Sequence, residues 1–450
     1  MSKISAWNKG VIILIFSLVF SRIFFLHPTF SDENFYFNVA KNLVEGLLPY
    51  KDFFFAHPPL QILLLASLFK IFGAFFMTGK IFTLLTSSLC ILMVYLISKN
   101  LYDEKTGFVA AVIFSIFPAF ISFSLIGYGM WESLLFFLIS FYLVLKNKVF
   151  KSSLFFVAAI FTRYIALLYL PFLLLTIHLK KGKISHFLKF FISISSPIFL
   201  SLLAIFKGFY FQQTFEYHLT SKLGVKDANP MQYWSIGFFT FFLAIFTIFI
   251  SFREKDRKLL FLSLTALTTD LVILLFFNLF FYHYFLISLP LYAICTARSF
   301  NISRDFLIRF SLLTIVLLSL ISNSKTIDFY LNPHHSKTFK IFESLIKNET
   351  EEDEKIFGEP VITNYLSFIT GRKISGNFFD SYLSHIIFEG EEKVIEILNE
   401  EKPKILIEAN FGKEYYLSSQ KFKDFVSRNY ELVEKIENTQ IYFVYRLKNK

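Results

Sequence analysis

The sequence is poor in charge and in cysteine. Only 18% of its 450 residues are charged, whereas soluble domains average about a quarter, so an ordinary soluble globular protein is excluded. Its two cysteines, Cys90 and Cys295, both lie inside apolar runs, and a disulfide-stapled fold is therefore not expected. The chain also lacks a P-loop, a dinucleotide-binding glycine pattern and a Ser-His-Asp signature. Nothing in it indicates a P-loop ATPase, a Rossmann oxidoreductase or a serine hydrolase.

Long apolar runs, by contrast, recur along the chain. Each approaches the roughly 20 residues that a helix needs to cross a hydrocarbon core. Such runs must be helical, because in lipid every backbone polar group has to be paired internally. They are Val11–Phe25, Ile81–Ile97, Phe108–Ile126, Phe187–Phe206, Phe238–Phe252, Leu259–Phe277 and Phe306–Ile321. The first is too long for a signal-peptide core and lacks a cleavage site, so we interpret it as a retained span. The sequence predicts an α-helical polytopic membrane protein.

The net charge of +11 is unevenly distributed. Residues 1–324 carry 27 Lys and Arg against 13 Asp and Glu, and residues 325–450 carry 18 against 21. The basic excess lies in short loops between the apolar runs, which is typical of the positive-inside rule rather than of a nucleic-acid-binding patch. The most basic loops are Lys146–Lys151, Lys180–Lys189, Arg253–Lys258 and Arg298–Arg309. We predict that these loops, together with the N-terminus, are cytosolic.

This orientation requires about 11 transmembrane helices. Pro58–Phe72 is too short to cross and is expected to be a juxtamembrane or partly inserted helix on the outer side. Ser153–Leu179 must leave and return as two short spans with a turn around Arg163. The external segments are then Pro28–His57, Gly127–Glu132, Lys207–Tyr233, the tip at Asn278–His283, and everything after Ile321. Phe215–His218 followed by Leu223–Asn229 is either a mobile loop that closes over substrate or a plain connection.

The character of the chain changes near Lys325. Apolar runs shorten to strand length at Lys404–Glu408 and Ile441–Arg446, and Glu391–Asn399 has the pattern of an amphipathic helix. We predict two domains: residues 1–324 form the transmembrane domain, and residues 325–450 form a small extracytoplasmic α/β domain packed against it.

The first external segment, Ser31–Leu60, contains the clearest candidate functional residues. Ser31 is a candidate N-cap for a helix with Asp32 and Glu33 in its first turn, where the helix dipole favours acids. The apolar spacing predicts an amphipathic helix in the membrane interface that stops near Gly46. From this pattern alone, a pair of capping acids explains Asp32 and Glu33 as well as a catalytic role does.

The order of motifs from here on resembles the GT-C glycosyltransferases. Asp32-Glu33, the Gly-x-x-Pro-Tyr-x-Asp element that contains Tyr50, and His57-Pro58-Pro59-Leu60 are similar to the branch of protein O-mannosyltransferases and lipid A aminoarabinose transferases. The resemblance covers about residues 28–165, and beyond them it consists of topology, a His-Tyr pair and an external C-terminal domain. It implies a transmembrane catalytic domain that moves a sugar from a polyprenyl-phosphate carrier to a protein, glycan or lipid acceptor, with inversion, on the extracytoplasmic face of the cell membrane.

The resemblance also implies roles for individual residues. Asp32 is the expected base that deprotonates the acceptor, since a phosphate leaving group needs no general acid. Glu33 and Glu132 are further catalytic candidates, although relatives often carry Asp where Glu132 stands. The expected donor-binding residues are His57, Arg163, His283, Tyr284 and Tyr50. A divalent metal ion is left open, with Glu33, Glu132, His57 and His218 as candidate ligands.

Several of these residues fit simpler roles as well. Glu132 fits an interfacial helix start equally well, Arg163 fits a charge that extends to the membrane surface, and Tyr282-His283-Tyr284 fits an aromatic belt. The alternative function is a polytopic transporter or lipid-linked sugar flippase, although the related half-helix pairs of many transporters are not evident. A membrane scaffold is a third possibility.

Overall fold

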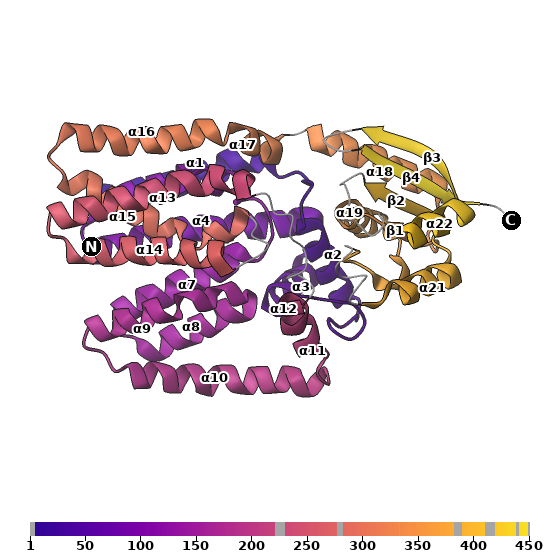
Figure 1. The fold of residues 1–450 in the computed structure, drawn as a ribbon, viewed down its shortest axis with the longest axis horizontal. Coiled ribbons are helices and arrows are strands. Elements are labelled where there is room, and N and C mark those ends of the chain that lie inside the picture. Colours follow the sequence, from indigo (N-terminus) through magenta and orange to yellow (C-terminus); the bar gives the residue numbers. More distant parts are fainter. Residues whose placement is uncertain are drawn as a thin grey trace.

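The computed structural model describes residues 5–220, 230–276, 282–332, 334–381, 389–409, 419–437 and 441–448. A bundle of apolar helices forms one part of the molecule, and a smaller part that contains a β-sheet lies beyond one end of it (Figure 1). The short helices α2, α3, α11 and α12 lie between the two.

The bundle is formed by long and medium-length helices. They are α1 (Ala6–Arg22), α4 (Phe76–Leu101), α5 (Glu104–Ile116), α6 (Pro118–Phe123), α7 (Met130–Leu145), α8 (Val149–Thr162), α9 (Leu170–Leu179), α10 (Ile184–Ile205), α13 (Pro230–Arg253), α14 (Arg257–Phe276), α15 (Leu289–Ile302) and α16 (Phe306–Ser322). Shorter elements are the 3-10 helices η1 (Ile23–Phe25), η2 (Tyr164–Tyr169) and η5 (Tyr282–Leu286).

The structure supports a membrane protein, but it shows fewer full-length spans than the sequence predicts. Among the described residues, the helices long and apolar enough to cross a membrane are Ala6–Ile23, Phe76–Leu101, Ile184–Ile205 and Arg257–Leu275. Further apolar helices of 10–17 residues accompany them. Prolines break several runs: Pro118 starts α6 after α5, and Pro171 lies in the first turn of α9. The count of about 11 spans stays a prediction.

The four basic loops lie at the end of the bundle away from the sheet (Figure 1). Arg253 Nη1 lies 3.2 Å from Asp305 Oδ2, and Arg298 Nε lies 2.8 Å from Asp256 Oδ2, so the α13–α14 and α15–α16 connections meet. The connection between α7 and α8 and that between α9 and α10 reach the same end in Figure 1. All four predicted cytosolic loops therefore lie at one end of the molecule, and the orientation they imply in the membrane stays a prediction.

The opposite end carries the elements of the predicted external segments. They are α2 (Glu33–Val44), α3 (Leu60–Phe72), α11 (Phe209–Phe211), the π-helix η3 (Gln212–Glu216) and α12 (Tyr217–Thr220). α3 begins directly after Pro59 and ends before Gly73, whose φ of +88° favours glycine. Residues 223–229 of the predicted mobile loop and residues 278–281 of the predicted tip lie outside the described residues.

The C-terminal part combines helices with one four-stranded sheet. Its helices are α17 (Ser324–Leu331), α18 (His334–Glu349), α19 (Pro360–Thr370), the 3-10 helix η6 (Ser375–Asn377), α21 (Glu391–Glu401) and α22 (Gln420–Asn429). Its strands are β1 (Ile356–Gly358), β2 (Ile405–Ala409), β3 (Tyr430–Glu437) and β4 (Ile441–Leu447), in the order β1-β2-β4-β3. β1 pairs parallel to β2, and the other pairs are antiparallel. The predicted helix and both predicted strands are present.

Helix α2 differs from its prediction in two ways. Asp32 rather than Ser31 is the N-cap residue, and the Ser31 hydroxyl lies 2.8 Å from that of Thr29 instead of capping the helix. The helix also has no solvated polar face at its start, since every residue from Glu33 to Ala40 is buried. The surface predicted to face water is covered by α19 of the C-terminal part, which places that part directly over the predicted catalytic segment.

Candidate active site

Asp32 lies at the start of α2, where this helix faces both the bundle and the C-terminal part. Its side chain is half-buried and makes no capping hydrogen bond to the helix. Its negative charge acts on Tyr36, one turn further along α2, and on Glu359, which precedes α19. A half-buried carboxylate at this junction is accessible to a substrate, as a base requires.

Glu33 occupies a different environment from Asp32. It is fully buried, and its carboxylate oxygens lie 2.7 and 2.9 Å from Lys80 Nζ in α4. Thr29 donates a hydroxyl hydrogen bond at 2.7 Å to the same carboxylate, and the Gly127 amide donates one at 3.4 Å. Lys80 also donates to the Leu125 carbonyl at 3.0 Å. Glu33 thus ties α2 to α4 and to the loop before α7.

Arg163 lies at the point where α8 ends and η2 begins, and only 7% of it is exposed. Its Nη2 donates to Gln61 Oε1 at 2.9 Å and to the carbonyl of Tyr128, and its guanidinium stacks 4.6 Å from the centroid of the Tyr36 ring. Its Nε is buried without a hydrogen-bond acceptor among the described residues. A desolvated guanidinium with a free donor can hold an anion strongly.

Gly129 makes room for this arrangement. Its φ is +76°, and a Cβ there would lie 2.3 Å from Gln61 Oε1 and 2.9 Å from Arg163 Nε. Only glycine combines this backbone conformation with such a close approach.

His283 lies on the same side of the site as Arg163. Its ring centroid is 4.6 Å from that of Tyr128 and 4.9 Å from that of Tyr284. Because the Tyr128 carbonyl accepts a hydrogen bond from Arg163 and the Tyr128 ring contacts His283, the loop before α7 connects these two predicted donor-binding residues. The structure thus brings Arg163 and the adjacent His283 and Tyr284 together from two separate parts of the chain.

The His57 ring also belongs to this cluster. Tyr50 contacts the backbone of His57. The His57 ring is 5.9 Å from the Tyr36 ring and 5.7 Å from that of His218 in α12. Tyr50 is only 2% exposed, and its hydroxyl donates to the His57 carbonyl at 2.6 Å. His218 Nε2 lies 2.7 Å from the Ala56 carbonyl. Tyr50 therefore positions the backbone of His57, and its predicted contact with substrate stays a prediction.

Glu132 is buried in the first turn of α7, with 2% exposed. Neither carboxylate oxygen has a hydrogen-bond partner among the described residues, and the positive charge of Arg163 acts on Glu132.

Of the predicted metal ligands, His57 and His218 are neighbours, and Glu33 is paired with Lys80. In the described part of the chain, no three His, Cys, Asp or Glu side chains gather as a metal site would require.

Sequence reasoning missed several residues of the site. Tyr36, Gln61 and Tyr128 carry the contacts between Arg163 and the external segments, and Lys80 neutralises Glu33. The lone Lys80, directly before the apolar run Ile81–Ile97, was a detectable signal, because a charge at membrane depth usually has a partner. Glu359 and Asp380, whose charge acts on Tyr36, had no such signal, since they lie more than 300 residues from Asp32 in the sequence.

Glu359 should make the stability of the protein depend on pH. Burial raises its pKa to about 7, the backbone amides of Ile362 and Val361 oppose this, and the charge of Asp32 raises it. Its folded-state pKa lies above the ordinary 4.5, so the stability that neutral Glu359 contributes is complete below about pH 4.5 and lost as pH rises through about 7. We expect Glu359→Gln to gain stability relative to wild type between pH 5 and 8, by at most about 3 kcal/mol.

The measurement is thermal unfolding in detergent, taken as the difference between Glu359→Gln and wild type at each pH. Other titrating groups, including the neighbouring Asp32, are present in both proteins and largely cancel in this difference. A difference that is constant across this range would contradict the prediction.

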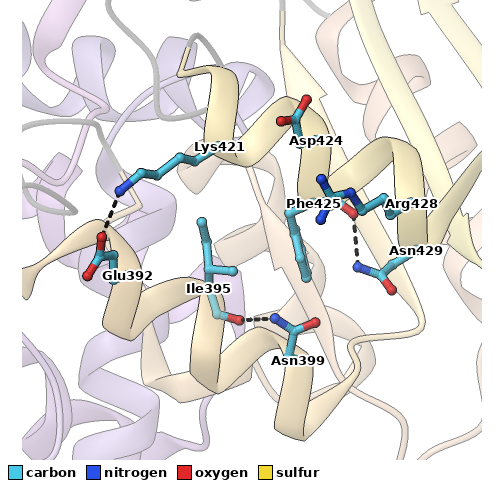
Figure 2. A pocket seen from close by; sticks show the side chains of 8 residues that line it. All are labelled: Glu392, Ile395, Asn399, Lys421, Asp424, Phe425, Arg428 and Asn429. Carbon is cyan, nitrogen blue, oxygen red and sulfur yellow. Dashed lines mark hydrogen bonds and ion pairs between the residues drawn. The ribbon is translucent and has the colours of Figure 1, made fainter.

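A separate pocket lies on the surface of the C-terminal part, between α21 and α22 (Figure 2). Its lining is Glu392, Ile395, Asn399, Lys421, Asp424, Phe425, Arg428 and Asn429. Lys421 Nζ already pairs with Glu392 at 2.7 Å, and Asn399 and Asn429 bond to carbonyls of their own helices. None of the predicted site residues lines this pocket, so we place the candidate active site around α2.

No family model matches this chain, and no curated protein sequence matches it. Solved structures with the same fold do exist. Lipid A aminoarabinose transferase ArnT from Cupriavidus metallidurans, bound to undecaprenyl phosphate, superposes with a TM-score of 0.66 at 10% identity over 98% of each chain. The oligosaccharyltransferase of Archaeoglobus fulgidus gives a TM-score of 0.58 at 12% identity over 99% of this chain and 75% of its own. In complex with an inhibitory peptide and a dolichol-phosphate, that protein (AglB) gives 0.55 at 11% identity over 98% of this chain and 74% of its own. The chain therefore has the membrane fold of the GT-C glycosyltransferases.

Proposed function

We propose that the protein is an inverting glycosyltransferase that moves a sugar from a polyprenyl-phosphate carrier to an acceptor on the extracytoplasmic side of the membrane. The observation that carries the proposal is that a half-buried acid and a buried cation both lie close to one aromatic side chain, Tyr36. Asp32 and Arg163 both act electrostatically on Tyr36, and the Arg163 guanidinium lies against the ring face. One group can take a proton while the other receives a departing anion.

The chemistry of such a transfer matches these side chains. Phosphate leaves readily without a general acid, so one carboxylate to deprotonate the acceptor and cations to hold the leaving group are sufficient. A glycosidase would instead need two carboxylates that flank the bond. Undecaprenyl phosphate and dolichol-phosphate are bound in two solved structures with this fold, which supports a carrier of that class here.

We assign the following roles to the residues, and their positions support each one. Asp32 is the base, Arg163 receives the phosphate through its unpaired Nε, and His283 and His57 border the same space. Glu33 holds α2 in place through Lys80 rather than touching substrate. Glu132 is buried near Arg163 and contributes to the electrostatic potential at the phosphate site.

The test is transfer of label from a radiolabelled polyprenyl-phosphate sugar to native membrane acceptors. Membranes that contain the protein should form a labelled product, and membranes from a strain that lacks it should not. Mass spectrometry of glycoconjugates from the two strains should show one sugar missing. A transporter or flippase would instead move the labelled lipid between leaflets without forming a product, and that result would refute the proposal.

Arg163 provides a prediction for the donor side. Arg163→Gln removes the charge that receives the phosphate, and we expect transfer to fall about 10²-fold, as when one oxyanion donor is lost. Arg163→Lys should restore only part of the activity, since an ammonium cannot keep the planar contacts to Gln61 and Tyr36. Arg309→Gln at the opposite end of the bundle is the matched control. Equal losses in both variants would argue against a specific role for Arg163.

A further inference from the structure

Helices α2 and α19 lie side by side and run in the same direction. Three hydrogen bonds advance together along both: Asn34 Nδ2 to the Val361 carbonyl at 3.1 Å, Asn38 Nδ2 to Asn364 Oδ1 at 2.9 Å, and Lys41 Nζ to the Phe368 carbonyl at 3.0 Å. The two helix starts therefore meet. Asp32 is the N-cap residue of α2 and Glu359 is that of α19, so an acid from each part of the molecule stands at the same place.

At this junction, one carboxylate oxygen of Glu359 accepts a hydrogen bond from the described part of the chain and the other does not. It is 1% exposed, and its side chain accepts the Ile362 amide at 2.7 Å through Oε2. Its Oε1 is buried with no hydrogen-bond partner in the described residues, and the same holds for Asn34 Oδ1 and Thr363 Oγ1. Buried polar atoms are almost always paired in folded proteins. Unpaired atoms from both helices therefore indicate that a polar ligand binds at this point.

The charges around Tyr36 indicate that this polar ligand is the acceptor rather than the donor. Arg163 lies over the ring, while Asp32 and Asp380 contribute negative charge near the same side chain. A departing phosphate belongs beside Arg163. In an inverting displacement the attacking oxygen approaches the sugar from the face opposite the leaving group, which is the side of Asp32 and of the C-terminal part.

We propose that the C-terminal part completes the acceptor subsite through Glu359 and Asp380, and that this subsite takes an uncharged or cationic hydroxyl compound and rejects an anionic one. The inference rests on the proposed function. Glu359 Oε1 hydrogen-bonds the acceptor and turns its hydroxyl toward Asp32. An anionic acceptor would lie near the negative charges of Asp32 and Asp380, and like charges brought together in an interface cost several kcal/mol.

The reaction balances with these groups. Asp32 takes the proton of the acceptor hydroxyl, and the acceptor oxygen bonds to the anomeric carbon of the sugar. The bond from that carbon to the phosphate oxygen breaks, and its electron pair leaves with polyprenyl phosphate, whose charge Arg163 holds. Glu359 and Asp380 exchange no atoms and act by positioning and by charge.

The first test uses wild-type protein in lipid nanodiscs with a radiolabelled polyprenyl-phosphate sugar. Native membrane extract, separated on an anion exchanger into retained and unretained pools, supplies the acceptors. We expect at least tenfold more labelled product from the unretained pool. Product formed mainly from the retained, anionic pool would overturn the acceptor assignment while leaving the proposed function intact. No consumption of donor with either pool would overturn both.

The second test separates a positioning role from a structural one. Glu359→Gln can still cap α19 through its amide oxygen, and we expect it to raise the half-saturating amount of acceptor extract about tenfold while the apparent KM for the donor stays within twofold. Glu354→Gln is the matched control, because Glu354 also accepts a backbone amide, that of Glu351 at 2.8 Å, but lies on a partly exposed turn. Donor and acceptor constants that rise together, or equal effects in both variants, would overturn the assignment of Glu359.

Discussion

Asp32→Asn is expected to lower sugar transfer by about 10²–10⁴-fold, the usual contribution of a positioned base. Asparagine keeps the size of the side chain and its place at the N-cap, where both residues are favoured, so the fold should persist. The loss should appear in kcat rather than in the KM for the donor, because Arg163, not Asp32, is the residue proposed to hold the phosphate. Steady-state transfer of a radiolabelled lipid-linked sugar at varied donor concentrations measures both.

A control on the same helix shows whether the effect is specific. Glu45→Gln removes an exposed carboxylate just beyond the C-terminal end of α2, and it should leave transfer within twofold of wild type. Thermal unfolding of Asp32→Asn in detergent should match wild type within a few degrees. Full activity in a folded Asp32→Asn protein would show that another group is the base.

Lys80→Met is expected to destabilise the protein by about 3–5 kcal/mol, because it leaves the Glu33 carboxylate charged and buried without its partner. Both side chains are 0% exposed and lie 2.7 Å apart, so water cannot replace the lost contact. The double variant Glu33→Gln/Lys80→Met removes both charges, and it should be clearly more stable than Lys80→Met alone. Thermal unfolding in detergent measures the three proteins.

The same helix supplies the control for this pair. Lys99 in α4 pairs with Glu104 at 2.6 Å, but both side chains are about one-third exposed. Lys99→Met should therefore cost no more than about 1 kcal/mol, as surface ion pairs do. If Lys80→Met and Lys99→Met cost the same, the pair of Lys80 and Glu33 is not what holds α2 to α4.

Much of the candidate site could be predicted from short stretches of sequence. Asp32 and His57 were expected at the site because their motifs resemble those of a known family, and Arg163 because a charge interrupts an apolar stretch; all three lie near Tyr36. The roles of neighbouring residues could not be predicted in this way. Asp32 and Glu33 are adjacent in the chain, yet Asp32 is half-buried at the junction with the C-terminal part and Glu33 is fully buried against Lys80.

For the C-terminal part too, local helices and strands could be predicted from the sequence, but its contacts with the rest of the chain could not. Its helix and strands followed from local periodicity, and both predicted strands, with the helix at Glu391–Glu401, are present. Its contribution to the site did not follow, because α19 reaches α2 through contacts between residues separated by 327 positions, such as Asn34 and Val361. The predicted solvated face of α2 was wrong for this reason.

Three properties of this chain could be inferred without its fold: it forms apolar helices, its basic residues gather in short loops, and an acid follows its first apolar helix. These properties depend on the transfer of side chains between water and an apolar phase and on backbone pairing within single helices, both of which act over a few turns. The folded chain was needed to show that Lys80 neutralises Glu33, that Arg163 stacks on Tyr36, and that Glu359 meets Asp32. Those pairings depend on which helices lie next to each other, and this is settled by the packing of the whole chain rather than by any one stretch of it.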